Sequence, residues 1–491
     1  MIIRMLKRRS LIVIVFGLIA FLSYEWSLLA PKADAIPAFA RKYNFACNVC
    51  HVPGFPKLND FGNLFRDHGY QMGGENDLPE HESINMGYWP VSLRTQVGYR
   101  SLSIGPDGKN GGEVTNGSFG FKTLNLLSYG VLAKDTSYGI IYAPNLNSAN
   151  YGAASTGSDL PNAFVRLNNL QRFLGGDATS YLMNVKVGKY EPELPFSAFR
   201  NPTQFNTPIV FYNYRAGNPY TSANFPANSR ISSGYGNSTM SSLQQGMNGL
   251  ELAGIKPTSG TNGYFRYSLN AFSTTGPFGN GGGRNMIFYG HATQSFDGYG
   301  IVSGHRIGIS WWQGDSPTVA NPLVPAGQNN AAGGSGGTSG TGKTFSRVAL
   351  DASTTFDGQW NLFGSIIHAR DSKDLIANTA GQGPRQDAVW NGGFAELDWY
   401  PTELPFFGTP GWLLLYRYDL VRNEQQGLRS FQGNYNNVDS HTWMTRYYIH
   451  QSARTDVAWH TEYNWFRTRA TGTNGRDVVG QMFFTGIDFA L

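Results

Sequence analysis

From about residue 91 to the end of the chain, apolar and polar residues alternate with a period of two, which is typical of β-strands with two different faces. One face of each clear segment is apolar, whereas the other carries charged residues such as Arg94, Arg417 and Glu462. The apolar positions of three such segments are Val91, Leu93, Thr95, Val97 and Tyr99; Trp412, Leu414, Tyr416, Tyr418 and Leu420; and Val457, Trp459, Thr461, Tyr463 and Trp465. Burying the charged face in the dry core of a sandwich is costly, whereas a water-filled lumen leaves it hydrated. The pattern therefore predicts a barrel wall between lipid and a pore.

The segments between the alternating runs are typical of hairpin turns. Asp357-Gly358 is the favoured type I′ dipeptide, and residues 134–136 and 453–455 close two further hairpins. Neighbouring strands are therefore expected to be antiparallel. Counting the runs predicts about sixteen strands, with roughly 25 residues for each strand and its connection. The last run alternates up to Leu491, as expected for a strand that closes a barrel. A soluble β-sandwich or β-helix is the second fold considered.

Residues 321–342 are rich in Gly, Ser, Asn and Ala and are expected to form a long extracellular loop. Within and just after this tract, residues 337–344 match the phosphate-loop pattern letter for letter. That mechanism needs a strand before the loop and a helix after it. Because Val348, Leu350, Ala352 and Thr354 predict a strand after it, we expect no nucleotide binding.

Residues 36–89 follow a helical pattern instead. Leu58, Phe61, Phe65 and His68 recur on one face of a helix expected at 59–68, and Gly69 fits the C′ position that ends a helix. A shorter helix is expected at 37–45. About fifty residues are too few for a self-sufficient core. We therefore expect this module to lean on another surface.

Residues 1–35 have the features of an export signal. Basic residues between positions 4 and 9 precede the apolar run 11–22, and Ala33-Asp34-Ala35 offers a small-residue cleavage site. An uncleaved inner-membrane anchor is the alternative. The prediction is a cleaved signal peptide and a protein of the bacterial outer membrane.

Composition and charge agree with a barrel and exclude one class of partner. The formal net charge is +5, and most of it comes from residues 1–35, so the mature chain is near +2. Such a chain has no nucleic-acid footprint. Charged residues make up 14% of the chain and aromatic residues another 14%, a composition suited to a large secreted β-protein or an outer-membrane barrel.

The only two cysteines of the chain, Cys47 and Cys50, precede His51 in the motif Cys-Asn-Val-Cys-His. This spacing lets both thiols bond to the vinyl groups of a haem while the histidine ligates the iron. The alternative interpretations of this motif are a redox cysteine pair, a disulfide and half a zinc site. Zinc would need further ligands nearby, and a redox pair would normally lie in a βαβ unit. We therefore predict one covalently bound haem c, with His51 as the proximal ligand.

The distal ligand of the iron is open at this point. His68 lies on the apolar face of the expected helix, and Met72 lies on the irregular segment that follows it, so these two are the candidates. His81, Met86 and a histidine of the barrel such as His460 were also weighed. The choice matters because a methionine raises the haem potential and a second histidine lowers it.

Residues 39–47, Cys50-His51, 55–62, Phe65 and Gly69-Tyr70 resemble the haem module of the fused outer-membrane monohaem cytochrome-porins of iron-oxidising bacteria. The order of parts is similar as well: signal peptide (1–35), monohaem cytochrome c module (36–89) and porin-like barrel (90–491). The resemblance covers about forty residues and implies a haem in the pore that takes electrons from extracellular Fe(II). The periplasmic acceptor would be a soluble cytochrome c or a copper protein.

The resemblance thus implies an outer-membrane electron conduit that acts as an Fe(II):cytochrome c oxidoreductase. Two other functions use the same parts. One is a diffusion porin in which the haem segment is a plug or sensor, and the other is a conduit that exports electrons to an extracellular acceptor. A barrel fold alone does not choose among them.

Overall fold

The structure is a computed structural model that describes part of the chain. The described residues are 38–43, 45, 47–52, 57–73, 77–85, 87–106, 114–144, 160–176, 180–194, 203, 214, 247–260, 263–273, 286–296, 305–316, 343–373, 386–401, 411–427, 437–451, 455–469 and 477–490. The expected signal peptide, Met86, the tract 321–342 and Leu491 lie outside these residues. No helix among the described residues is long and apolar enough to cross a membrane.

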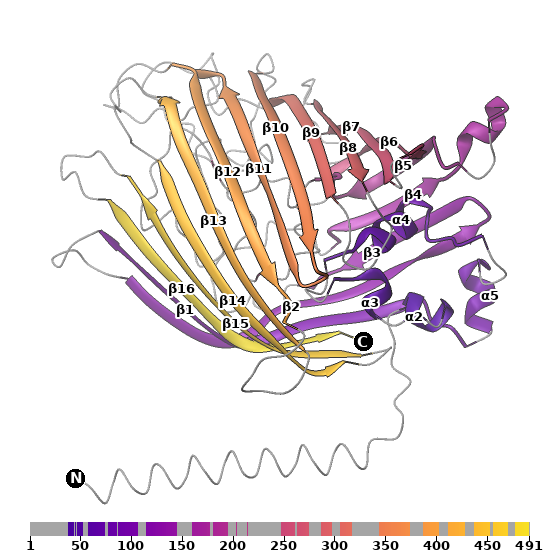
Figure 1. Ribbon diagram of the computed structural model, residues 1–491, viewed down its shortest axis with the longest axis horizontal. Coiled ribbons are helices and arrows are strands. Elements are labelled where there is room, and N and C mark those ends of the chain that lie inside the picture. The colour runs from indigo at the N-terminus through magenta and orange to yellow at the C-terminus, as the bar shows by residue number, and fades with distance from the viewer. Residues whose placement is uncertain are drawn as a thin grey trace, which may run out of the picture. The chain divides into compact units, whose positions relative to one another are not determined.

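Sixteen antiparallel strands form one closed barrel, in which each strand pairs with its neighbours in the chain and β1 pairs with β16 (Figure 1). The prediction of about sixteen antiparallel strands is confirmed. The strands are β1 (Val91–Pro106), β2 (Val114–Ala133), β3 (Thr136–Tyr142), β4 (Asn162–Leu167), β5 (Asn184–Tyr190), β6 (Met247–Thr258), β7 (Gly263–Ser273), β8 (Met286–Phe296), β9 (His305–Ser316), β10 (Lys343–Phe356), β11 (Trp360–Asp371), β12 (Ala388–Trp399), β13 (Trp412–Gln425), β14 (Val438–Gln451), β15 (Asp456–Thr468) and β16 (Val478–Ala490).

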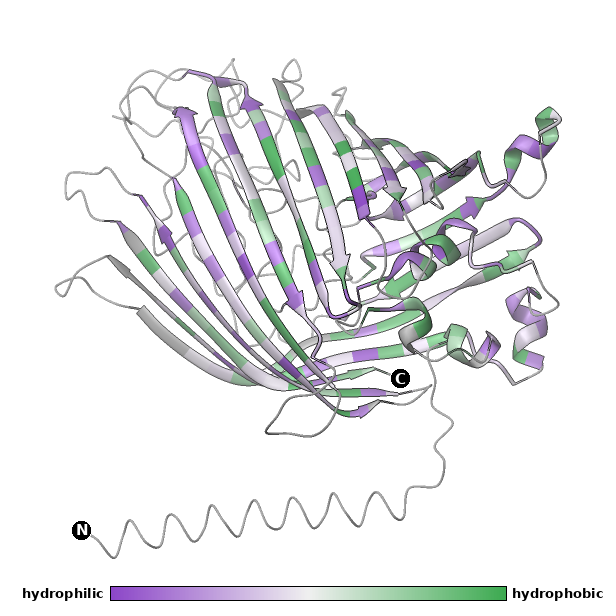
Figure 2. Ribbon diagram, viewed as in Figure 1, coloured by the Kyte–Doolittle hydropathy of each residue, from purple (hydrophilic) through white to green (hydrophobic). Residues whose placement is uncertain are grey.

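The two faces of the wall differ as the alternating sequence predicted. Figure 2 shows hydrophobic and hydrophilic residues alternating along the strands. On β15, Trp459 faces outward with 50% of its surface exposed, whereas the next residue, His460, faces inward and is 0% exposed. Large apolar side chains such as Ile366 and Leu350 are likewise exposed on the outside. An apolar outer face and a polar inner face are what a barrel needs in a bilayer.

The connections divide the barrel into two ends. At one end, the short segments 134–135, 259–262, 357–359 and 452–455 join even-numbered strands to the next odd-numbered strand. We call this the short-connection end. The long segments 143–161, 191–246, 317–342 and 372–387 join strands at the opposite end, the long-connection end. In the hairpin at 357–359, Asp357 has a φ of 51° and Gly358 a φ of 66°, which agrees with the type I′ turn expected from these residues.

Among the residues that the structure describes, four short helices precede the barrel: α2 (Ala38–Tyr43), α3 (Cys47–Cys50), α4 (Asp60–Asp67) and α5 (Glu80–Asn85). A 3₁₀ helix, η1 (Leu170–Leu174), lies between β4 and β5. Helices α2 and α4 agree with the helices expected at 37–45 and 59–68, whereas α5 was not predicted. Helices α2 and α5 pack against β2 (Figure 1). The N-terminal segment therefore leans on the wall of the barrel.

Helix α4 begins and ends with the signals that its sequence carries. The side chain of Asn59 accepts a hydrogen bond from the backbone N–H of Gly62 at 2.8 Å, which caps the first turn. At the other end Gly69 has a φ of 68°. The N–H of Gly69 donates to the carbonyl of Arg66 at 3.0 Å, and that of Tyr70 donates to Phe65 at 2.9 Å. These two bonds form a Schellman motif, so the predicted role of Gly69 is confirmed.

Part of the inner face differs from the water-filled lumen expected from the sequence. Inward-facing aromatic side chains, including Phe272, Trp312 and Trp390, form a buried apolar cluster. Tyr214, from the segment between β5 and β6, packs on Trp390 with ring centroids 4.8 Å apart. The expected charged positions Arg417 and Glu462 do face inward, but both are 0% exposed. Other parts of the chain cover this wall, so its charges are paired rather than hydrated.

Candidate functional site

The Cys-Asn-Val-Cys-His motif forms the short helix α3 and the first residue after it. The chain then folds back, so that His51 forms an isolated antiparallel bridge with Leu58. The N–H of Val52 donates to the carbonyl of Lys57 at 3.0 Å, and the N–H of Asn59 donates to the carbonyl of Cys50 at 3.0 Å. The side chain of Asn59 also donates to the carbonyl of Val49 at 3.0 Å. These bonds fix α3 against the start of α4.

Helix α4 approaches α3 at a glycine. A Cβ atom placed on Gly62 would lie 2.0 Å from the carbonyl oxygen of Cys50, closer than any real contact. Only glycine allows the two helices to lie this close together. The role of Gly62 could not be predicted from the sequence, because it depends on a contact between two helices rather than on a pattern within one.

We expect Gly62→Ala to separate α3 from α4. Overpacking of this kind costs about 1–3 kcal/mol, so the backbone bond from Asn59 to Cys50 should open more often. Hydrogen exchange at the Asn59 amide should become roughly five- to a hundredfold faster. The matched control is Gly290→Ala, since the nearest atom to that added Cβ is 3.4 Å away. Equal protection of Asn59 in wild type and Gly62→Ala would contradict the close approach.

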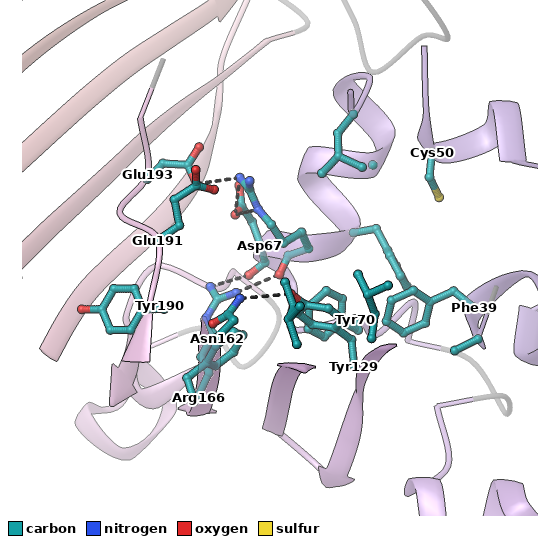
Figure 3. A pocket seen from close by; sticks show the side chains of 18 of the residues that line it. Phe39, Cys50, Asp67, Tyr70, Tyr129, Asn162, Arg166, Tyr190, Glu191 and Glu193 are labelled. Atoms are coloured by element: carbon teal, nitrogen blue, oxygen red, sulfur yellow. Dashed lines mark hydrogen bonds and ion pairs between the residues drawn. The ribbon is translucent and has the colours of Figure 1, made fainter. Parts of the chain in front are cut away.

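A cavity of about 280 Å³ lies between this segment and the inner wall (Figure 3). Cys50, His51 and Leu58 line it from the N-terminal segment. Figure 3 shows Cys50 and Phe39 on one side and Tyr190, Glu191 and Glu193 on the other. Further lining residues come from eight strands: Ser92, Leu93 and Arg94 of β1; Asn125, Leu127 and Tyr129 of β2; Ile141 of β3; Asn162, Phe164 and Arg166 of β4; Lys186 of β5; Glu251 of β6; Arg266 of β7; and Ala490 of β16. The motif and the barrel thus enclose one space. Cys47 begins α3, but its side chain is not among those described.

Aromatic side chains of the N-terminal segment form one wall of this cavity. Tyr43, Phe65 and Tyr70 are buried together, and Phe39, Phe45, Phe61 and Tyr129 pack against them. Phe39 stacks on Tyr70 and meets Phe65 edge to face, with ring centroids 5.0 Å apart in both cases. Tyr70 continues to Tyr129 on β2 at 5.7 Å. The helix face predicted from Phe61 and Phe65 therefore contributes to the apolar side of the cavity.

Two arginines of the wall hold the C-terminal end of α4. Arg266 on β7 contacts Asp67 through Nε at 2.6 Å and through Nη2 at 3.0 Å. Arg266 also contacts Glu193, which reaches Arg66 at 3.0 Å. Arg166 on β4 donates to the carbonyls of Arg66 and Asp67, at 2.8 Å each. Both carbonyls belong to the last turn of the helix, where backbone acceptors lack intrahelical partners, so Arg166 adds donors from the wall to the Gly69 N–H that already reaches Arg66.

Burial raises the pKa of Asp67 to about 6, although the neighbouring guanidinium of Arg66 lowers it. Its carboxylate is therefore mainly ionised at neutral pH and can hold Arg266. Burial also raises the pKa of Asp60, at the start of the same helix, to about 7, with Arg306 acting in the opposite direction.

A second anchor joins the segment to strands elsewhere in the ring. Lys57 Nζ donates to Asp398 on β12 at 2.8 Å and to Asn361 on β11 at 2.7 Å, and it lies 3.7 Å from the ring centre of Phe363. Asp398 is fully buried. Val52 packs in a buried cluster whose other members are Tyr400, Leu413, Leu415 and Met444.

A third anchor lies beside β1 and β2. The N–H of Ala38 donates to Ser92 Oγ at 2.9 Å. Lys42 Nζ pairs with Glu80 at 2.8 Å, and the same carboxylate accepts the N–H of Val131 at 3.2 Å. All three anchors contact strand residues near the short-connection end. Because these strands stand on different sides of the ring, the segment spans the lumen at that end.

The structure places neither candidate distal ligand among the residues that line the cavity. His68 stacks on Tyr181 with ring centroids 4.3 Å apart. Burial, helped by Arg166, lowers the pKa of His68 to about 4, so its imidazole is neutral near pH 7. Met72 is 44% exposed, and its backbone N–H donates to Asp77 at 2.8 Å.

The other histidines that were weighed lie elsewhere. The side chain of His81 is 72% exposed beside Glu82. His460 is fully buried in the wall, 3.2 Å from Glu462. The distal assignment to His68 or Met72 stays a prediction. Among the residues that the structure describes, no group of three or more His, Cys, Asp or Glu side chains is arranged to hold a metal ion.

Solved structures with a similar course of the chain are bacterial outer-membrane proteins. The anion-selective porin from Comamonas acidovorans is 12% identical, with 82% of this chain and 99% of that chain covered and a TM-score of 0.46. OprB of Pseudomonas putida is 10% identical, with 82% and 94% covered and a TM-score of 0.42. The outer membrane channel DcaP of Acinetobacter baumannii is 12% identical, with 81% and 96% covered and a TM-score of 0.40.

No protein-family model matches this chain, and no curated protein matches it. The strand pairing of this chain by itself shows a closed antiparallel barrel.

Proposed function

We propose that this chain is an outer-membrane electron conduit in which one haem c, held by Cys47, Cys50 and His51, occupies the cavity between the N-terminal segment and the barrel wall. The observation that carries the proposal is the cavity itself. Cys50 and His51 line it together with residues from eight strands, and anchors on several sides of the ring hold the segment that bears them.

The residues present fit a covalently attached haem. The cavity has an aromatic side, formed by Phe39, Phe65 and Tyr70, that suits the flat face of a macrocycle. Basic residues such as Arg94 and Arg166 also line the cavity, and carboxylates on the rim of a haem need such partners. The side chain of Cys50 is half-buried and lines the cavity, where a thioether bond to a haem would form.

Each residue then has a definite task. Cys47 and Cys50 attach the group, and the imidazole of His51 ligates its iron. When bound, the haem supplies one-electron redox chemistry. Gly62 and Asn59 hold α4 against the attachment helix, and Lys57 and Asp67 hold the whole unit to the wall. A fixed position matters because electron transfer depends on distance to the donor and the acceptor.

The position in the lumen favours transfer across the membrane. The hydrocarbon core of a bilayer is roughly 30 Å thick, which is too far for a single electron transfer. A redox group inside the barrel divides this distance. The N-terminal segment contacts strands near the short-connection end, and short turns face the periplasm in outer-membrane barrels. A soluble periplasmic cytochrome c or copper protein would then dock at that end.

The donor is the part of the proposal that rests on resemblance. The similarity of residues 39–70 to the haem module of iron-oxidising cytochrome-porins implies extracellular Fe(II) as donor and an Fe(II):cytochrome c oxidoreductase activity. The second candidate is a diffusion porin with a haem-bearing plug, and the closed barrel is compatible with it. A conduit that exports electrons would use the same residues with the opposite driving force.

Stopped-flow visible spectroscopy tests the donor. The oxidised protein in detergent is mixed with Fe(II), and the band of the reduced haem is followed in time. We expect fast reduction that saturates with Fe(II) concentration in the wild type and is lost in His51→Ala. A haem that stays oxidised under these conditions would reject Fe(II) as donor while leaving haem attachment intact.

A further inference from the structure

A groove on the outer face of the barrel combines an aromatic surface with arginines. Tyr416 and Tyr418 of β13, His441 and Trp443 of β14, and Tyr463 and Trp465 of β15 face outward side by side, and we call them the aromatic platform. His441 lies at its centre, with ring centroids 4.9 Å from Tyr418, 5.6 Å from Trp443 and 5.5 Å from Trp465. The hydroxyl of Tyr416 is 2.8 Å from His441 Nδ1, which fixes the ring.

Three arginines lie beyond the platform, toward the long-connection end. They are Arg422, Arg467 and Arg469, and we call them the arginine cluster. Arg422 pairs with Asp439 at 2.5 Å, whereas Arg467 and Arg469 both pair with Asp477 at 2.6 Å. Three guanidinium groups thus share two carboxylates. The cluster carries one excess positive charge, because Arg467 and Arg469 share the single carboxylate of Asp477.

Four residues of the platform and two arginines of the cluster line one common groove of about 480 Å³. Its lining residues are Tyr416, Tyr418, Asp439, His441, Trp465, Arg467 and Arg469. One end of the groove is therefore aromatic and the other is charged. The side chains of Arg467 and Arg469 keep about a third of their surface exposed, at 31% and 33%.

We propose that this groove binds the phosphate-bearing headgroup of a membrane lipid at the long-connection end of the barrel. The inference rests on the membrane location in the proposed function, but not on the haem. Tyrosine and tryptophan side chains of membrane proteins lie at the level of the lipid headgroups. Arginines just beyond such residues therefore meet the lipid phosphates, which guanidinium groups bind with two parallel hydrogen bonds.

Native mass spectrometry in detergent tests the site with diphosphorylated lipid A as the probe. We expect the double variant Arg467→Ala/Arg469→Ala to bind this lipid about tenfold more weakly than the wild type, since hydrogen bonds to charged groups are lost. The single variant Arg469→Gln gives a smaller loss in the same direction and guards against misfolding of the double variant. Arg370→Ala is the matched control, because Arg370 on β11 also pairs with one acid, Asp387, at 2.8 Å, but lies outside the groove.

Two further arms separate the sources of phosphate. Lipid A without phosphate groups should bind wild type and double variant equally, and inorganic phosphate at millimolar concentration should not displace the lipid. Displacement by inorganic phosphate would show a free-anion site and reject the lipid. Equal binding of diphosphorylated lipid by wild type and both variants would also overturn the proposal. Flotation of the wild type with liposomes tests the membrane location separately, so the failure of one can be told from the failure of the other.

Discussion

Replacing both Cys47 and Cys50 by alanine is expected to abolish covalent haem binding. Without the two thioether bonds, any haem dissociates from the chain during denaturing electrophoresis. The variant should therefore show no haem-stained band. The pyridine haemochrome spectrum of the purified protein should fall to background, whereas the wild type should give about one haem per chain. This effect is all or none, because the chain has no other cysteine that could take over the attachment.

Val49→Ala is the control for this variant. It changes a residue inside α3 but keeps both thiols and His51, so haem content should stay close to that of the wild type. Barrel assembly is followed separately by the change of gel migration on heating, which should be the same in all variants because the strands close without the cysteines. A wild type that lacks haem when it is expressed together with a haem-attachment system would overturn the cofactor proposal.

The strands could be predicted from the sequence because the two faces of a barrel wall differ so strongly. Trp459 and His460 are neighbours in the chain, yet one is half exposed on the outside and the other is fully buried inside. Because successive side chains of a strand point to opposite faces, the polarity of each residue indicates which side of the wall it faces. The end of α4 was predictable for a similar reason, since the left-handed conformation at Gly69 strongly favours glycine.

The anchors of the N-terminal segment could not be predicted in the same way. Lys57 contacts Asn361 and Asp398, which are hundreds of positions away in the chain, and no local pattern indicates which acid a lysine will meet. Helix α5 is short and has no clear apolar face, and it is placed by the contacts of Glu80 with Lys42 and Val131. Which residues meet in such contacts depends on how the barrel closes around the N-terminal segment, and not on the sequence of that segment alone.

The prediction of a water-filled lumen failed in part for the same reason. The alternating pattern correctly predicted that Arg417 and Asp419 point inward. It could not show which other residues of the chain cover them. Thr203, from the long segment between β5 and β6, lies 3.3 Å from Arg417. Arg417 also pairs with Glu396 and Asp419, so charges that would be hydrated in an open pore stabilise a covered one.

Breaking two anchors at once is expected to open the barrel to ions. In the double variant Lys57→Met/Arg266→Met, the carboxylate of Asp398 loses Lys57, and that of Asp67 loses Arg266 and keeps only Arg66, at 3.2 Å. Removing one partner of a buried ion pair costs about 3–5 kcal/mol. The N-terminal segment is short and depends on these contacts, so it should leave its position for part of the time. Single-channel recording in a planar bilayer should then show frequent openings.

The wild type should give no steady conductance in the same recording, because the segment spans the lumen. Arg370→Met is the matched control, since its ion pair with Asp387 lies on the exposed outer face and has no role in holding the segment. Haem content should stay unchanged in both variants, because neither alters the attachment residues. Steady conductance of the wild type would contradict a closed conduit and would support the diffusion porin. A closed wild type that opens only when Lys57 and Arg266 are replaced would instead mean that the barrel keeps ions out while its lumen holds a redox group in place.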